Sequence, residues 1–587
     1  MAFYNGTSSY DKNPHIKIKG FDNQAYAGYD AIYQELEKKI KDLNKEKTVL
    51  ILDYYHGVNE KEIFDGLIGR FANATKINIE EAKLPESVLS EKLKREITDD
   101  RVFGVLSVRR LDEFFDCKKL EEVKKQAADI KSGLVIIYGT GAGLIEGDIL
   151  VYADMARWEI QQRFRRKELG NWGVGNLDED VLRKYKRSFF IEWRALDRHK
   201  KRLFDKFTYL LDTNKKDQPK MISGDAFRAG LEQAIEKPFR LVPFFDPGVW
   251  GGQWMKEVCN LDKSAPNYAW CFDGVPEENS INLKYGDIEV EIPAIDLVFY
   301  KPVELLGDKV HARFGTEFPM RFDFLDTMEG GNLSLQVHPL VEYIQEKFGM
   351  HYTQDESYYI LDAGDDGSVY LGTKTGIKPE ELIDELKKAQ SGEESFPDEK
   401  YINKFPAKKH DHFLIPAGTV HCSGKNAMIL EISATPYIFT FKLWDWERVG
   451  MDGVPRPVHI DYGKENIRYE RNTEWVEKNL INRIEKISEE DGCLEERTGL
   501  HEREFIETRR HWFNKKIEHN TDGLVNMLNL IEGEEAIIES PENKFDPYIV
   551  HFAETFIVPA NVGRYTIRPY GKSEGKKIAT LKAFVRV

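Results

Sequence analysis

Strict alternation of apolar and polar residues over residues 333–338 restricts the fold of this chain more than any other feature. The segment reads Leu-Ser-Leu-Gln-Val-His. Alternate side chains of a β-strand share a face, so Gln336 and His338 point to one side while the leucines and the valine face a core. The pattern therefore predicts a half-buried strand of a mainly β domain, with a polar inner or outer face.

Two further short segments carry polar side chains of the same kind. Glu356 lies in the strand-like run Glu-Ser-Tyr-Tyr-Ile-Leu, and His421 follows a Pro-Ala-Gly turn that comes after an apolar run. An amide oxygen, a carboxylate and two imidazoles suit a zinc-type divalent ion that keeps an open position for substrate or water. The alternative is a set of ordinary strand residues with hydrogen-bonded partners. The candidate ligands are Gln336, His338, Glu356 and His421.

Length and charge limit the classes of protein to which this chain can belong. Its 587 residues suggest roughly three to four domains. The formal charge is −16 and no large basic stripe interrupts it, which argues against nucleic acid as a partner. No segment approaches the ~18 consecutive apolar residues of a membrane span. The five cysteines are widely spaced, without a CxxC pair, and no signal peptide opens the sequence, so we expect a cytoplasmic protein in a reducing compartment.

Residues 1–235 alternate between strand-like and helix-like stretches. Residues 48–55 (TVLILDYY) and 133–138 (GLVIIY) are apolar runs of strand length. Such runs are typical of parallel strands buried on both faces, and their alternation with helices predicts an α/β domain with a parallel sheet. Residues 155–211 are mostly helical in pattern and rich in arginine and lysine.

Glycine-bearing loops follow both apolar runs, at residues 55–59 and 139–143. A strand, a glycine loop and a helix can cradle phosphate. Neither loop ends in GK[ST], and neither matches GxGxxG followed by a ribose-binding acid. The layout is faintly similar to P-loop uridine-kinase-like domains, which implies a nucleotide or sugar-phosphate ligand. The loop lacks the defining lysine, so a structural or partner-binding domain with an eroded phosphate loop explains the sequence at least as well.

Residues 239–587 resemble class I mannose-6-phosphate isomerases, a family with a cupin fold. The resemblance rests on Gln-Val-His-Pro, a glutamate before an aromatic pair, Pro-Ala-Gly-Thr-Val-His, a Leu-Glu-Ile strand and Trp-Asp-Trp-Glu-Arg, in that order. A Trp-Gly-Gly segment at residues 250–252 adds to it. The resemblance is strong to about residue 460. It implies one Zn²⁺ per chain, held by the four candidate ligands, and a small sugar phosphate as substrate.

Two domains are expected within this stretch. Residues 239–460 would form the metal-binding cupin isomerase domain, with a helical insertion at residues 378–405. Residues 461–587 would form a second, metal-free cupin-like domain, because residues 556–563 echo the Pro-Ala-Gly turn without its histidine. We expect residues 239–587 to fold without residues 1–220, since they have their own strand set. The predicted fold is thus multidomain, an N-terminal α/β domain followed by mainly β cupin barrels.

Aldose–ketose isomerisation needs a base near C1 and C2 and a donor or Lewis acid near the oxygens. The family carries a glutamate at the place of Glu431, our first choice for proton transfer; it could instead orient a ligand or a water. Lys442 stands where the family has an arginine, and it keeps the charge but loses the bidentate fork.

Other positions around the expected pocket depart from the family. Asp323 and Gln354 stand where the family has lysines. Arg321, Lys374 and Arg448 are the remaining candidates to bind substrate. The predicted activity is zinc-dependent interconversion of mannose 6-phosphate and fructose 6-phosphate. The alternatives are a catalytically inactive sugar-binding regulatory protein and an isomerase for a different sugar.

Overall fold

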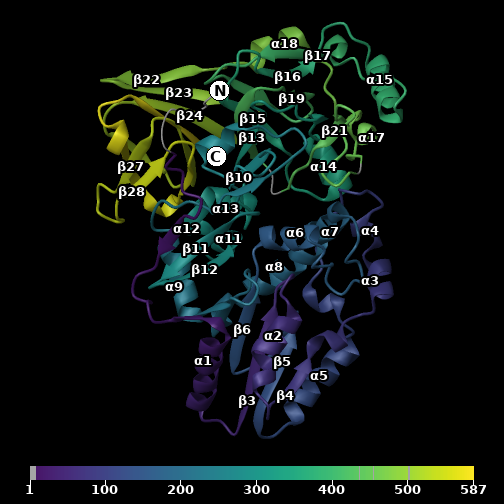
Figure 1. Cartoon of the computed structure of the whole chain (residues 1–587), viewed down its shortest axis with the longest axis vertical. Coiled ribbons are helices and arrows are strands. Elements are labelled where there is room, and N and C mark those ends of the chain that lie inside the picture. Colours follow the sequence, from purple (N-terminus) through teal and green to yellow (C-terminus); the bar gives the residue numbers. More distant parts are fainter. Residues whose placement is uncertain (1–7, 435–436, 454, 500, 502) are drawn as a thin grey trace. The chain divides into compact units, whose positions relative to one another are not determined.

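A computed structural model describes residues 8–434, 437–453, 455–499, 501 and 503–587. The chain folds into two compact units, which we call the α/β unit and the β unit (Figure 1). The α/β unit comprises His15–Ala234 and Ser280–Tyr300, and the β unit comprises Met1–Pro14, Ile235–Asn279 and Lys301–Val587. Residues 280–300, which the sequence assigns to the isomerase domain, thus complete the N-terminal α/β unit.

A seven-stranded sheet forms the centre of the α/β unit. Its central strands are parallel, and β8 and β2 continue the sheet in antiparallel pairing beyond β7. The predicted α/β class and parallel sheet are therefore present. In spatial order the strands are β2 (Ala25–Ala27), β8 (Lys220–Ser223), β7 (Tyr209–Asp212), β6 (Ile149–Asp154), β3 (Lys47–Tyr54), β5 (Gly133–Gly139) and β4 (Thr75–Asn78).

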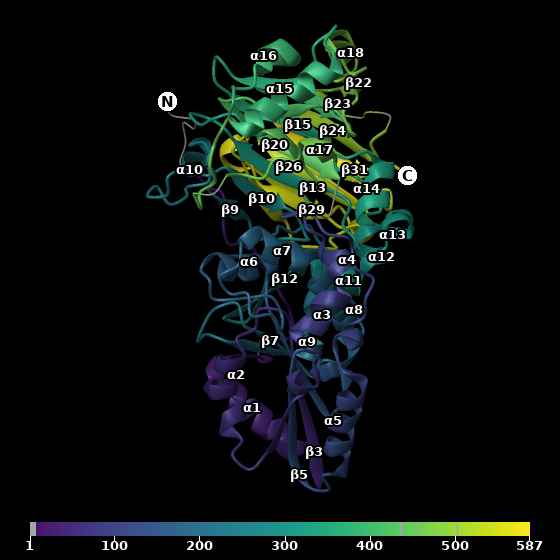
Figure 2. The ribbon, with the colours of Figure 1, turned by 90° about the vertical axis from the view of Figure 1, so that its right-hand side faces the viewer.

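Helices cover both faces of this sheet. Helix α1 (Gly28–Leu43) buries Ile32 and Leu36 against the face of β3 that carries Leu50 and Leu52. Figures 1 and 2 show α1 and α5 (Cys117–Asp129) on opposite sides of β3 and β5. Burial on both faces explains why residues 48–55 form a nearly continuous apolar run. Other helices of the unit are α2 (Glu60–Gly66), α6 (Arg157–Arg165), α7 (Val181–Arg187), α8 (Trp193–Lys201) and α9 (Gly224–Ala234).

A small sheet joins the two segments of the α/β unit. Strand β1 (His15–Lys17) runs parallel to β11 (Ser280–Tyr285), and β11 forms a hairpin with β12 (Ile288–Pro293). The Tyr285 hydroxyl donates to the Ala226 carbonyl of α9. The hairpin is therefore bound to the unit by backbone pairing as well as by side chains.

Two sheets form the first half of the β unit. No strand pairing closes either of them into a barrel within the described residues, so the expected cupin barrel appears as two open sheets. The six-stranded sheet has the order β18 (His412–Ile415), β15 (Asp355–Ala363), β20 (Ala427–Ala434), β13 (Arg321–Asp326), β10 (Trp270–Gly274) and β9 (Phe244–Asp246). The five-stranded sheet has the order β17 (Ile402–Pro406), β16 (Ser368–Thr373), β19 (His421–Ser423), β14 (Leu335–Val337) and β21 (Phe441–Trp444).

Helix α15 (Pro379–Ser391) lies between β16 and β17 in the chain, where the sequence predicts a helical insertion. It starts with a proline at its first turn and ends at Gly392 in the left-handed conformation, both usual helix boundaries. Among the described helices of the whole chain, none is both long and apolar enough to cross a membrane.

A second pair of sheets forms the C-terminal part of the β unit. Between these sheets lies an apolar core that includes Phe513, Leu528 and Tyr565. The six-stranded sheet has the order β22 (Glu485–Glu490), β23 (Cys493–Gly499), β24 (Ile506–Phe513), β31 (Ile578–Val585), β26 (Asn526–Glu532) and β29 (Thr555–Val558). The four-stranded sheet has the order β25 (Ile517–Asn520), β30 (Arg564–Pro569), β27 (Glu535–Glu539) and β28 (Tyr548–His551).

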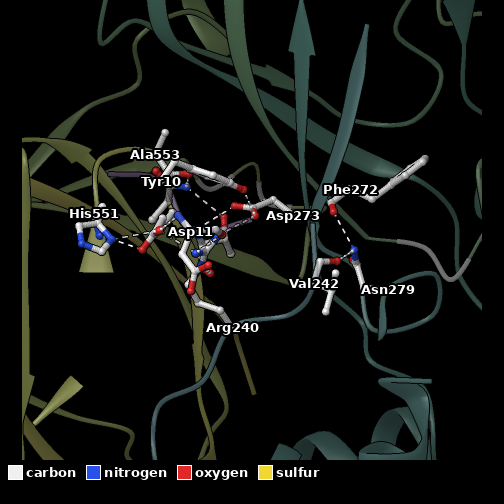
Figure 3. A network of polar contacts seen from close by, with 12 residues as sticks. Tyr10, Asp11, Arg240, Val242, Phe272, Asp273, Asn279, His551 and Ala553 are labelled. Atoms are coloured by element: carbon white, nitrogen blue, oxygen red, sulfur yellow. Dashed lines mark hydrogen bonds and ion pairs between the residues drawn. The ribbon is translucent and has the colours of Figure 1, made fainter. Parts of the chain in front are cut away.

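A buried polar network ties the N-terminal segment of the chain into the β unit (Figure 3). The Arg240 guanidinium lies 2.7 Å from Glu554 and 3.4 Å from Asp273. The Tyr10 hydroxyl donates to Asp273 over 2.6 Å, and the Asp11 backbone N–H donates to Glu554 over 2.6 Å. Arg240 therefore neutralises these carboxylates of the β unit, and residues that precede the α/β unit in the chain donate hydrogen bonds to them.

Candidate metal centre

Three side chains converge between the first two sheets of the β unit. The Nε2 atom of His338 lies 3.0 Å from Glu356 Oε2, and that of His421 lies 2.8 Å from Glu356 Oε1. Glu356 comes from β15 of one sheet, whereas His421 begins β19 of the other and His338 follows β14. His338, Glu356 and His421 are buried, and within the described residues they form the one group of ligand atoms compact enough to hold a metal ion.

The orientation of both imidazoles is fixed by backbone carbonyls. His338 Nδ1 lies 2.8 Å from the Phe439 carbonyl oxygen, and His421 Nδ1 lies 2.8 Å from that of Thr419. A carbonyl oxygen only accepts, so each Nδ1 must carry the proton of its hydrogen bond. Each ring consequently presents Nε2 toward Glu356, the arrangement that metal-ligating histidines adopt.

The short distances from Glu356 to His338 and His421 require a positive charge between these side chains. His338 Nε2 and Glu356 Oε1 are buried atoms that form no hydrogen bond within the described structure. A bare imidazole nitrogen and a carboxylate oxygen repel each other at 3 Å unless a proton or a cation lies between them. Burial raises the pKa of Glu356, but a positive charge on His338 and His421 outweighs it and holds the pKa well below its usual range. The carboxylate is thus ionised, as a metal ligand must be.

Two glutamine side chains border this cluster. Gln336 pairs in register with His421 across β14 and β19, and its Nε2 lies 3.2 Å from His421 Nε2. An Asn or Gln amide group can be turned over without changing its shape, which would aim the Gln336 oxygen at the same point. Gln354 donates to Glu356 Oε2 and accepts the Phe439 backbone N–H. It therefore orients a candidate ligand rather than offering charge to a substrate.

Strand register gathers further polar side chains on the same inner face. Asp323 of β13 and Tyr358 of β15 both pair with Glu431 of β20. Arg321 and Glu356 both pair with Ser433 on that strand. Directly paired residues of antiparallel strands point to the same face. The face that bears the candidate ligand Glu356 thus also bears Arg321, Asp323, Tyr358, Glu431 and Ser433.

Two acids on this face have raised pKa values. Burial, with the Glu356 and Asp323 carboxylates, raises the pKa of Glu431 well above its ordinary value. Burial likewise raises the pKa of Asp323 to about 6, against the opposing effect of Arg321, whose guanidinium lies 3.3 Å from the Asp323 carboxylate. A carboxyl group with a raised pKa in an enclosed polar face can take up and return a proton near neutral pH.

Lys442 lies in the other sheet, beside the candidate ligands. It pairs with Gln336 across β21 and β14, and Gln336 in turn pairs with His421. Lys442, Gln336 and His421 therefore form one row on one face. Lys442 is half-buried.

The other two cations selected from the sequence have different surroundings. Arg448 donates to the Asn332 carbonyl over 2.7 Å and to Asp445 over 2.6 Å, so it fastens the loop that precedes β14. Lys374 follows β16, and its backbone N–H donates to the Tyr401 carbonyl. Neither contact set directs the side chain to the candidate ligands; their predicted role in substrate binding stays a prediction.

Sequence reasoning missed Tyr358 and Ser433. The Tyr358 ring packs edge-on against that of His421 at 5.9 Å, and the Tyr358 and Ser433 hydroxyls are buried without a hydrogen bond in the described structure. Both residues lie two positions from a selected glutamate, so strand alternation carried the signal. The sequence could not indicate that the Thr419 and Phe439 carbonyls bind the two imidazoles, because every residue has a backbone carbonyl.

Of the two glycine loops of the α/β unit, the one at residues 139–143 has two N–H groups engaged by carboxylates. The Gly141 N–H donates to Asp53 over 2.7 Å, and the Thr140 N–H donates to Glu80 over 3.0 Å. His199 Nε2 lies 2.7 Å from Asp53 as well. These loops lie at the carboxyl ends of β3 and β5, close to where open parallel sheets bind ligands. Internal carboxylates here occupy donors that a phosphate would need.

Comparison with known proteins covers the two units separately. Residues 28–236 match the model of a domain of unknown function, DUF8485. The chain is 26% identical to the probable mannose-6-phosphate isomerase GmuF of Bacillus subtilis over 231 residues, which is 39% of this chain and 68% of GmuF. It is 25% identical to the mannose-6-phosphate isomerase of Streptococcus mutans over 215 residues, which is 36% of this chain and 62% of that protein. The chain thus spans about two thirds of the length of these relatives.

A crystal structure of the mannose 6-phosphate isomerase from Bacillus subtilis is also similar to this chain. The superposition covers 59% of this chain and 99% of that one, at 19% identity and a TM-score of 0.48.

Proposed function

We propose that the β unit is a metal-dependent aldose–ketose isomerase that interconverts mannose 6-phosphate and fructose 6-phosphate. The observation that carries this proposal is the pair of imidazoles that donate Nδ1–H to carbonyls and turn Nε2 toward one buried carboxylate. The similarity to proteins named mannose-6-phosphate isomerase supports the same activity.

Gln336, His338, Glu356 and His421 would hold one zinc-type ion per chain. The donor set, two imidazole nitrogens, a carboxylate and an amide oxygen, fits such an ion and leaves room for substrate. When bound, the ion supplies a Lewis acid for the substrate oxygens. Gln354 keeps Glu356 in place by its 2.9 Å hydrogen bond, as outer partners of metal ligands commonly do.

Glu431 would move the proton. As a carboxylate it removes the proton from C2 of the aldose while O1 gains a proton, which gives the cis-enediol. As a carboxylic acid it returns the carbon-bound proton to C1 while O2 loses its proton, so the net proton transfer from O2 to O1 completes the ketose. Its raised pKa makes the proton uptake more favourable than for an ordinary carboxylate. Lys442, on the row of Gln336 and His421, would stabilise the negative charge of the enediolate or of the phosphate group.

One observation favours a second candidate, an isomerase for a sugar that carries no phosphate. The inner face bears the acids Asp323, Glu356 and Glu431, and Arg321 is ion-paired with Asp323. Carboxylates accept hydrogen bonds from sugar hydroxyls but repel a phosphate dianion. An inactive sugar-binding protein would use the same face without turnover.

A substrate panel at fixed zinc content tests these functions together. Purified protein with one zinc per chain would be assayed with mannose 6-phosphate, mannose and other aldoses, beside Glu431→Gln protein of equal zinc content. We expect turnover of mannose 6-phosphate that Glu431→Gln abolishes. Faster turnover of mannose selects the second candidate. Calorimetric binding of a sugar without any turnover would refute an isomerase.

We propose the division into an α/β domain at residues 1–235, an isomerase domain at 239–460 and a second β domain at 461–587 as a functional division. The engaged N–H groups of the glycine loop favour a structural or partner-binding α/β domain over a kinase. A nucleotide or sugar phosphate remains the ligand to test first, by calorimetry with the chelated protein.

A further inference from the structure

Four polar side chains on the inner face of the first six-stranded sheet lie at the corners of one rectangle. Glu356 of β15 pairs with Ser433 of β20, and Tyr358 of β15 pairs with Glu431 of β20. Residues that pair directly, or that lie two positions apart on one strand, share a face of the sheet. Glu356 and Glu431 therefore lie on one diagonal of the rectangle, whereas Tyr358 and Ser433 lie on the other.

The first diagonal joins two groups that the proposed reaction uses. Glu356 is the candidate metal ligand that both histidines approach, and Glu431 is the group that would move the carbon-bound proton. Diagonal neighbours on two antiparallel strands are about 7–8 Å apart. The C1–C2 segment of a sugar, with its two oxygens, can span this distance. A substrate that reaches both carboxylates therefore lies between Tyr358 and Ser433.

The second diagonal carries two buried hydroxyl groups that can bind a ligand. Tyr358 and Ser433 are both 0% exposed, and neither hydroxyl forms a hydrogen bond within the described residues. The Tyr358 ring lies edge-on to that of His421, with 5.9 Å between the ring centres, so the tyrosine reaches a candidate ligand of the opposite sheet. A buried hydroxyl group without a partner costs free energy. Sugar oxygens placed between the two sheets would remove that cost.

We propose that Tyr358 and Ser433 are substrate-binding residues that hydrogen-bond the C1 and C2 oxygens of the sugar. This inference rests on the proposed isomerase function. A hydroxyl group both donates and accepts hydrogen bonds, so the same two side chains can hold the aldose, the cis-enediol and the ketose. They keep both oxygens on one side of the C1–C2 bond, which allows the single base Glu431 to reach C1 and C2 in turn.

Calorimetry with hexitol phosphates tests these contacts without turnover, on the full chain loaded with zinc. Mannitol 6-phosphate has the C1 and C2 hydroxyls but no carbonyl group, and its 1,2-dideoxy counterpart lacks both hydroxyls. We expect Tyr358→Phe and Ser433→Ala each to weaken mannitol 6-phosphate about threefold to tenfold, the usual effect of one lost hydrogen bond. Neither variant should change the affinity for the 1,2-dideoxy compound. Mannitol and 1,2-dideoxymannitol make the same comparison for a sugar without phosphate.

Tyr401→Phe is the matched control for the tyrosine variant. Tyr401 ends helix α16 (Asp398–Tyr401), is 1% exposed, and has a hydroxyl group that forms no hydrogen bond in the described structure. The control therefore removes the same kind of buried group at a place outside the rectangle. It should change the affinity for neither hexitol phosphate.

Zinc content and turnover separate this inference from the proposed function. Tyr358→Phe and Ser433→Ala should keep the zinc content of the parent protein and lower kcat/KM for mannose 6-phosphate by at least the factor seen in binding. If the parent protein shows the expected hexitol binding but turns over no sugar, the isomerase proposal is refuted and the two contacts are supported. If Tyr358→Phe protein does not fold, Ser433→Ala alone decides the outcome.

Three results would overturn the proposed contacts. The first is that the parent protein binds neither mannitol nor its phosphate. The second is that the variants bind mannitol 6-phosphate as tightly as the parent protein, or lose equal affinity for the 1,2-dideoxy compound. The third is that Tyr358→Phe protein loses zinc, which would show that Tyr358 supports the ligand Glu356 instead of the substrate.

Discussion

Replacing Arg240 by methionine should strongly destabilise the β unit. Arg240 is 3% exposed and lies between two buried carboxylates, 2.7 Å from Glu554 and 3.4 Å from Asp273. It also donates to the carbonyls of Asp11 and Thr555 (Figure 3). Methionine fills similar volume but leaves Asp273 without a cation, because Tyr10 contributes only a hydroxyl to it. Glu554 keeps His551, whose Nδ1 lies 3.1 Å from its carboxylate.

Removal of one partner from a buried ion pair costs about 3–5 kcal/mol, since the remaining charge stays buried and uncompensated. Burial raises the pKa of Asp273 and Arg240 opposes that rise, so loss of Arg240 makes this carboxyl group harder to ionise. Arg240 likewise outweighs burial in lowering the pKa of Glu554. With a slope of about 3 kcal/mol per molar urea, the midpoint of the β unit should fall by about 1–1.7 M.

Urea denaturation followed by tryptophan fluorescence measures this shift. Arg564→Met removes an exposed pair with Glu518 and should cost less than about 1 kcal/mol, which makes it the matched control. In Arg240→Met/Glu554→Gln protein, part of the loss should be recovered, because one buried charge is gone. An Arg240→Met midpoint within the range of the control would refute this account of the network.

The remaining predictions concern the metal centre and the division of the chain. His421→Ala should lose bound zinc, and elemental analysis with full occupancy would contradict the ligand set. Lys442→Met should lower kcat/KM about 100-fold to 1000-fold at unchanged zinc content. Lys442→Arg should keep turnover. Near-normal turnover of the Lys442→Met protein would show that Lys442 serves only in packing. Because the pKa of Glu431 is raised, its basic form accumulates at higher pH than for an ordinary glutamate, so kcat/KM should rise with pH toward neutrality; a flat profile from pH 5 upward would exclude Glu431 as the base. A fragment of residues 239–587 should have a lower melting temperature than the same fragment with residues 8–14 attached by a linker, because Tyr10 and Asp11 donate hydrogen bonds to Asp273 and Glu554. Equal melting temperatures in a thermal scan would show that residues 8–14 add no stability.

Strand alternation placed Gln336 and His338 on one face, and a strand-like run, a turn signal and the resemblance to the isomerase family added Glu356 and His421. Gln336 and His338 share a parity, as do Glu356 and Tyr358, and the structure brings the histidines to Glu356. Apolar and polar residues alternate in a strand that has one face buried, so the residues that share a face can be identified from the sequence. It could not reveal that Gln354 holds Glu356, nor that carbonyls fix both rings, because those contacts depend on how the two sheets face each other.

The division into units could not be read from the sequence for a similar reason. The pattern of residues 280–300 is that of an ordinary hairpin and helix, and only its partners show where it belongs. Composition changes near residue 239, which made the end of the α/β domain visible. A segment that returns to an earlier unit, as residues 280–300 do, shows no such change of composition in the sequence.

A buried lysine shows why the α/β unit needs the returning segment. Lys200, at the end of α8, is 1% exposed and lies 2.7 Å from Asp296 of the returning segment, while Asp154 at the end of β6 binds it from the other side. Both carboxylates outweigh burial and raise the pKa of Lys200, so the ammonium keeps its charge in the interior. A fragment that ends at residue 235 would lack Asp296, one of the two carboxylates that bind the buried Lys200. The segment 280–300 is therefore part of the core of the α/β unit, and a fragment meant to contain that unit must include it.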